Sequence, residues 1–237
     1  MDQNAKLKIF QAQVENTRSL KSGMKLLHRS VNDALRANDR PRADAFSKMY
    51  ALLFCSWAEA NFSKVLHTPH GFEIDEIKQV QKAKADGITA AWKKCVGLGL
   101  LHLDARRGSF KPNAQKKLEA IIDTHVFDPS VVRNKLAHGQ WIVALNRDND
   151  SVQTDITKRI SDIDVIRVTA WREGHQLLAD LVESLIESPK KAFVRDWYGC
   201  VANIELRIME AEKRTLDEHV RRLRSKDVRT GASTKRG

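Results

Sequence analysis

The sequence predicts an all-α protein, a bundle of about six to eight helices with one small β-hairpin. Three observations lead to this class. Apolar side chains recur at helical spacings along most of the 237-residue chain. Helix start and stop signals separate these periodic stretches, and only one short segment has the pattern of paired strands. With 42% apolar residues and five Trp, the chain is long enough to bury a substantial core.

Four helical segments are predicted in the first half of the chain. An amphipathic helix spans about residues 6–35, and a second, expected to be the most buried, spans about 41–66. Residues 73–101 are again helical in pattern, with an interruption at Gly87. A further helix is expected over about 112–124.

A short helix of about ten residues follows. Asp128 has the side chain of a helix N-cap, and Pro129 suits the first helical position, where a missing N–H costs nothing. Gly139 is a stop signal. Val132 and Leu136, four residues apart, are expected to form its buried stripe.

The β signal lies directly after this helix. Residues 141–145 are an apolar, strand-like run, 146–150 are a turn cluster, and 151–156 can pair back to complete a hairpin. Helical spacing then returns over about 162–187, and a last long helix is expected from about Lys190.

Charge and domain organisation point to a polyanionic partner. Residues 1–212 are expected to form a single helical domain with its core at about 40–188, followed at 213–237 by a basic helix end and a flexible tail. That last segment has nine Lys and Arg against three Asp and Glu. The whole chain has a net charge of +11 and a pI near 9.7, which favours binding to phosphate groups. Two roles of the tail stay open: its positive charge could bind RNA, or it could simply keep the protein in solution.

Several classes of protein are disfavoured. Cys55, Cys95 and Cys200 are odd in number and widely spaced among core-like residues, which argues against a disulfide framework or a zinc site. No apolar run approaches the roughly 18 residues of a membrane helix, and the first ten residues lack a signal-peptide core. We therefore expect a cytoplasmic protein with no membrane partner, no metal and no cofactor.

The short helix has the most informative residues in the chain. Arg133, Asn134 and His138 place a cation, a carboxamide and an imidazole within about two helical turns. At roughly 100° per residue, Asn134 and His138 share a face, whereas Arg133 and His138 lie about 140° apart. Either the last turn unwinds at Gly139, or Arg and His from two copies of the chain meet across a two-fold axis. We favour the second arrangement.

This segment resembles the motif of the HEPN superfamily (higher eukaryotes and prokaryotes nucleotide-binding). In that motif an Arg is followed by four to six residues, the first of which is usually polar and often Asn, and then by a His. The resemblance extends over about residues 40–188 and includes Trp57-Ala58-Glu59 on the second helix, where relatives often have an aromatic and an acidic or polar residue. Arg214 and His219 have the same spacing but lack this context, and we assign them no role.

The resemblance implies a metal-independent endoribonuclease of the toxin or antiviral-defence type, acting on RNA as a homodimer with a composite site. His138 would be the general base or acid, a role that histidine suits because it titrates near neutrality. Arg133 would bind the scissile phosphate, Asn134 would orient the imidazole or the phosphate, and Glu59 would fix Arg133 or His138. An antitoxin or defence-system protein is a further expected partner. Where some relatives have a Tyr that receives AMP, this chain has Gln140, so that form of control is not expected.

Other basic side chains are candidates for RNA contact, namely Lys135, Arg106, Arg107 and Lys111. A solvated loop beside a charged helix face is the alternative for the last three.

Two other functions stay open at this point. A non-catalytic HEPN module would bind RNA, nucleotide or a partner protein through the same cleft. A DNA-binding regulator would use the basic turn near Arg106 or the C-terminal helix. A purely structural explanation of the motif is a histidine that interacts favourably with the helix dipole.

Overall fold

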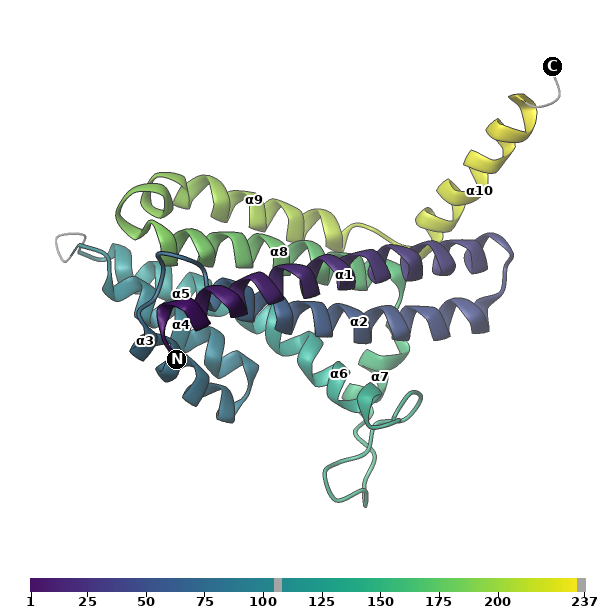
Figure 1. Cartoon of the computed structure of the whole chain (residues 1–237). Helices are drawn as coiled ribbons and strands as arrows, with labels where there is room; N and C mark the ends of the chain where they lie inside the picture. Colours follow the sequence, from purple (N-terminus) through teal and green to yellow (C-terminus); the bar gives the residue numbers. More distant parts are fainter. Residues whose placement is uncertain (105–107, 234–237) are drawn as a thin grey trace.

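Long helices form the body of the protein and confirm the all-α class. The computed structural model describes residues 1–104 and 108–233, with side chains up to residue 225. Helices α1 (Gln3–Arg36), α2 (Arg40–Leu66), α8 (Val165–Glu187) and α9 (Val194–Glu212) pack in that order, each against the next (Figure 1). The remaining helices cover the sides and ends of this body: α3 (Ile74–Ala83), α4 (Ile88–Leu101), α5 (Phe110–Ile122), α6 (Asp128–Ala137), α7 (Thr154–Ser161) and α10 (Leu216–Ser233).

Local signals account for the helix boundaries in the first half. The Asp39 carboxylate accepts a hydrogen bond of 3.1 Å from the N–H of Arg42, and Pro41 lies in the first turn, so α2 begins where the sequence predicts. Gly87 has a φ of 108° and separates α3 and a short 3₁₀ turn from α4, as its interruption of the pattern indicates.

The core consists of two clusters that meet along α2 and α8. One lies among α3, α4, α5, α8 and α9 and includes Trp92 and Leu178. The other lies among α1, α2, α6, α7 and α8 and includes Phe54 and Trp57. The side chain of His175, on α8, contacts rings from both clusters. This junction is the floor of the candidate site described below.

The predicted β-hairpin is reduced to one antiparallel bridge between Leu145 and Val152. The expected second strand is wrong beyond Gln153, because α7 begins at Thr154. Ile156 and Ile160, four residues apart, pack their side chains on the core, and this helical burial outweighs the strand preference of β-branched residues.

The basic C-terminal segment forms α10, which Figure 1 shows projecting away from the bundle. Its first turns pack on the body, where Val220 and Leu223 are buried against α1 and α8. The start of α10 is therefore docked on the bundle, and α10 is separate from α9, which ends at Glu212. Residues 234–237, part of the expected flexible tail, lie outside the described residues. Within the described part, no helix is both long enough and apolar enough to cross a membrane.

Candidate functional site

A π-helical turn leads directly into α6, the helix that contains Arg133 and Asn134 and that we call the motif helix. Residues Asp123–Phe127 join α5 to α6 without a break, and the N–H of Asp128 donates to the carbonyl five residues back. Pro129 has no N–H, and in a regular α-helix its ring would clash with the carbonyl of His125. A wider turn at this point accommodates the proline. The prediction that Asp128 is an N-cap is therefore wrong; its carboxylate instead pairs with Arg159 at 3.2 Å.

The motif helix ends as predicted. Gly139 has a φ of 78°, a conformation that favours glycine. Its N–H donates to the carbonyl of Leu136 at 3.1 Å, and the N–H of Gln140 donates to the carbonyl of Lys135 at 3.0 Å, the two hydrogen bonds of a Schellman motif. His138 is the C-cap residue and is exposed, and its ring has no hydrogen bond to any described residue.

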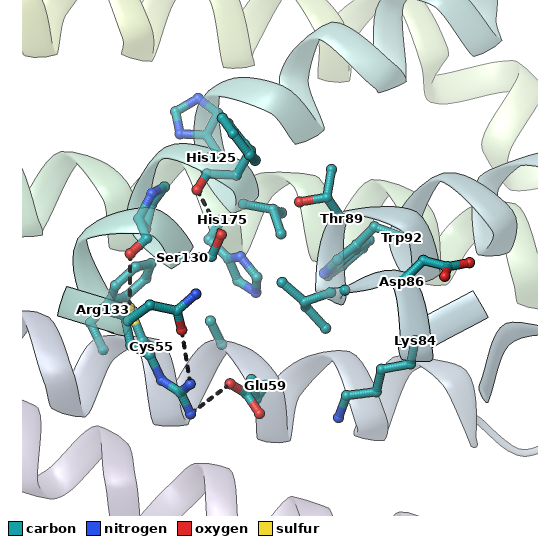
Figure 2. A pocket seen from close by; sticks show the side chains of 18 residues that line it. Cys55, Glu59, Lys84, Asp86, Thr89, Trp92, His125, Ser130, Arg133 and His175 are labelled. Carbon is teal, nitrogen blue, oxygen red and sulfur yellow. Dashed lines mark hydrogen bonds and ion pairs between the residues drawn. The ribbon is translucent and has the colours of Figure 1, made fainter. Parts of the chain in front are cut away.

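A cavity of about 350 Å³ opens beside this helix, between α2, α4, the π-turn, α6 and α8 (Figure 2). Arg133 and Asn134 line it, whereas His138 does not. The N–H of His138 donates to the carbonyl of Asn134 at 3.2 Å, and the Asn134 side chain contacts that of Arg133. One chain therefore brings together two of the three motif residues.

Glu59 holds the Arg133 guanidinium at the cavity. One guanidinium nitrogen lies 3.2 Å from a Glu59 carboxylate oxygen, and another donates to the side-chain oxygen of Asn134 at 3.2 Å (Figure 2). The Arg133 side chain is 41% exposed, so this ion pair contributes at most about 1 kcal/mol to stability. Its effect is orientation: Arg133 keeps further N–H donors for an anion. Of the two roles expected for Glu59, the structure brings it to Arg133.

The floor of the cavity is aromatic and uncharged. The ring centroid of His175 lies 5.4 Å from that of Trp57, 5.5 Å from that of Trp92 and 6.0 Å from that of Phe54. Burial, with a contribution from His125, lowers the pKa of His175 to about 3. Burial likewise lowers the pKa of His125 to about 4. Both imidazoles are therefore neutral at physiological pH.

Trp92 has an unsatisfied donor at this floor. Its indole N–H is buried and has no hydrogen-bond partner among the described residues. An orphan donor of this kind costs roughly 1–3 kcal/mol. Figure 2 shows Trp92 and Thr89 extending from α4 toward the centre of the cavity, opposite Ser130.

The sequence does not single out His125, His175 or Trp92. They come from three elements far apart in the chain, and each has the spacing of an ordinary core residue. Cys55 also lines the cavity, where burial raises the pKa of its thiol to about 12. It is therefore a thiol at physiological pH and unsuited to act as a nucleophile.

Of the basic residues predicted to contact RNA, Lys135 and Lys111 do not line this cavity. The Lys135 ammonium donates to the carbonyl of Leu145 and so fixes the loop after α6. Lys111 lies in the first turn of α5, at the opposite end of the α5–α6 run. Arg106 and Arg107 lie outside the described residues.

The second Arg-x4-His pair has structural partners. Arg214 pairs with Glu173 at 3.2 Å, and a ring nitrogen of His219 lies 2.8 Å from the side-chain oxygen of Asn32. These contacts join α10 and the segment before it to α8 and α1.

No cluster of three or more His, Cys, Asp or Glu side chains arranged to hold a metal ion occurs in the described ranges. Comparison of the chain with protein-family models, with curated proteins and with solved structures found no match.

Proposed function

We propose that this protein is a metal-independent endoribonuclease of the HEPN toxin or antiviral-defence type, restrained in the cell by an antitoxin or another partner protein. One observation carries the proposal. Glu59 and Asn134 hold Arg133 at a cavity large enough for part of an RNA strand, and an exposed His138 ends the same helix.

The proposed reaction is a transesterification that needs no metal. His138 takes the proton of the ribose 2′-hydroxyl, and that oxygen attacks the adjacent phosphorus. The bond from phosphorus to the 5′-oxygen breaks, and the leaving oxygen takes the proton that His138 now holds as an imidazolium, which returns the histidine to its neutral form. Arg133 binds the phosphate and stabilises the charge that builds on its oxygens. The products are a 2′,3′-cyclic phosphate and a 5′-hydroxyl.

The site is composite in this proposal. His138 lies outside the cavity that Arg133 lines, so Arg133 of one protomer would meet His138 of the partner subunit across a two-fold axis. Exposed apolar side chains beside α6 support self-association: Phe127 is 48% exposed and Ile142, on the following loop, is 78% exposed. Light scattering or sedimentation would establish the dimer.

The first test is RNA cleavage by the parent and by His138→Ala in the presence of a chelator. We expect the parent to leave cyclic phosphate ends and the variant to be slower by at least about 100-fold, the usual contribution of a general acid or base. His219→Ala is the matched control, because it has the same spacing from an arginine but binds Asn32 instead. Equal activity of the parent and His138→Ala, or cleavage that stops in chelator, would contradict the mechanism.

One observation favours a second candidate, a non-catalytic module that binds RNA, nucleotide or protein. A single chain presents Arg133 at a preformed cavity without His138. In that case the parent binds RNA without cutting it, and Arg133→Ala weakens binding whereas His138→Ala does not.

A further inference from the structure

The cavity beside Arg133 is deeper than phosphate binding requires. Its inner wall consists of Phe54, Ile88, Trp92 and His175, aromatic or aliphatic side chains of which Ile88 is partly exposed and the other three are buried. Side chains of this kind bind flat, uncharged rings by stacking and edge contacts. A phosphate alone gains nothing from them.

Uncharged polar groups lie at separate points of the inner part of the cavity. The buried ring nitrogens of His125 and His175 have no hydrogen-bond partner among the described residues. The buried indole N–H of Trp92 offers a donor without a protein partner in the described ranges. The hydroxyl of Thr89, one turn earlier on α4, can donate and accept, and Figure 2 shows it pointing into the same space. A nucleobase edge has both acceptors and donors, so it can satisfy these two groups together.

The charges around the cavity favour a ligand that is uncharged in the part that lies inside the cavity. Arg133 and Lys84 are balanced by Glu59 and Asp86, and all four are at least partly exposed. The two buried imidazoles on the inner side add no charge at physiological pH, because burial keeps the pKa of each well below its ordinary value. A neutral base can therefore occupy the interior while its attached phosphate stays at Arg133.

We infer that this cavity binds one unstacked nucleobase, adjacent to the phosphate that Arg133 holds, and so reads the sequence of the RNA beside the cut. This inference rests on the proposed function, in which RNA is the molecule that supplies the base. The cavity itself would accept the base of a free nucleotide equally well. Trp92 and Thr89 are the specificity-determining residues.

Binding of nucleotides tests the cavity apart from cleavage. Isothermal titration of the full chain with the four nucleoside 3′-monophosphates and with inorganic phosphate compares ligands with and without a base. We expect at least one nucleotide to bind at least 10-fold more tightly than phosphate. Trp92→Phe keeps the ring but removes the N–H, and Thr89→Val removes the hydroxyl at similar volume. Each substitution is expected to lower the affinity for that nucleotide about 5- to 30-fold and to leave the affinity for phosphate unchanged.

Trp197→Phe is the matched control, since Trp197 is also a buried core tryptophan but does not line the cavity. Melting curves of all variants verify folding. The inference fails if no nucleotide binds more tightly than phosphate, or if the control weakens nucleotide binding as much as Trp92→Phe.

A second arm separates RNA from free nucleotides as the source of the base. The parent and Thr89→Val are incubated with a random-sequence RNA, and the cut ends are sequenced. A base preference at the cut that is lost in Thr89→Val supports the inference for RNA. Cleavage without any base preference overturns it, even though the nuclease proposal then stands. Tight nucleotide binding without cleavage overturns the nuclease proposal and identifies the free nucleotide as the ligand of the cavity.

Discussion

Replacing Gly174 with alanine is expected to lower the free energy of unfolding by about 3 kcal/mol, although the change adds only one methyl group. A Cβ at this position would lie 2.2 Å from Cε1 and 2.3 Å from Nδ1 of His125. That ring belongs to the π-turn and is buried against α8, so the added methyl group can be accommodated only if the imidazole or the turn itself shifts. Urea unfolding measures the effect.

Gly199→Ala is the control for this prediction. Gly199 is in α9, and a Cβ there would meet nothing within 4 Å. This substitution is expected to stabilise the protein by roughly 0.5–1 kcal/mol, because alanine is the better helix former. If the two alanine variants have similar stability, the close packing of His125 on Gly174 is not as described.

Acid is expected to destabilise the protein through its two buried histidines. In the unfolded chain both imidazoles take up a proton near pH 6.5, whereas folding lowers the pKa of His125 to about 4 and that of His175 to about 3. The unfolded state therefore binds more protons below pH 6.5, and stability is lost as the pH falls from there toward these lower values. At pH 4 the loss is about 3 kcal/mol for each histidine, a large share of a typical domain's stability.

The measurement is the free energy of unfolding at pH 7, 6, 5 and 4. His175→Phe keeps an aromatic ring among Phe54, Trp57 and Trp92 but cannot titrate, so its stability is expected to fall less steeply with acid. Leu178→Ala, one turn further along α8, is the control: it lowers stability by about 2–5 kcal/mol and keeps the parent's pH dependence. Identical pH profiles for the parent and His175→Phe would contradict the assignment.

The long helices were predictable because their signals are local. Capping by Asp39 and the interruption at Gly87 act within a few residues, and the apolar spacing of α1, α2 and α8 repeats over many turns. Two features were missed where local signals are ambiguous. Residues around Ile156 are β-branched but fold as α7 because the core favours their helical face. Pro129 predicts the start of a new helix, but in the structure it follows a π-turn that joins α5 to α6 without a break. The sequence signal is the same in both cases.

The candidate site was predictable only on its outer side. Arg133, Asn134 and His138 share one short segment, and the resemblance added Glu59, which the structure brings within 3.2 Å of Arg133. The inner wall depends on how distant helices pack. No spacing in the sequence relates Trp92 to His175, and their contact exists only in the folded chain.

The π-turn also preserves the rotational phase between α5 and α6. A π-turn holds about one residue more than an α-helical turn, so it takes up an extra residue without turning the helix that follows. Deleting one residue within Asp123–Phe127 would therefore give a regular α-helix and leave α6 close to its present orientation about the helix axis. Val132 and Leu136 would stay in the core, and Arg133 would stay beside Glu59. A homologue aligned with a one-residue gap at this turn, and with another residue in place of Pro129, would therefore present the same motif in the same orientation.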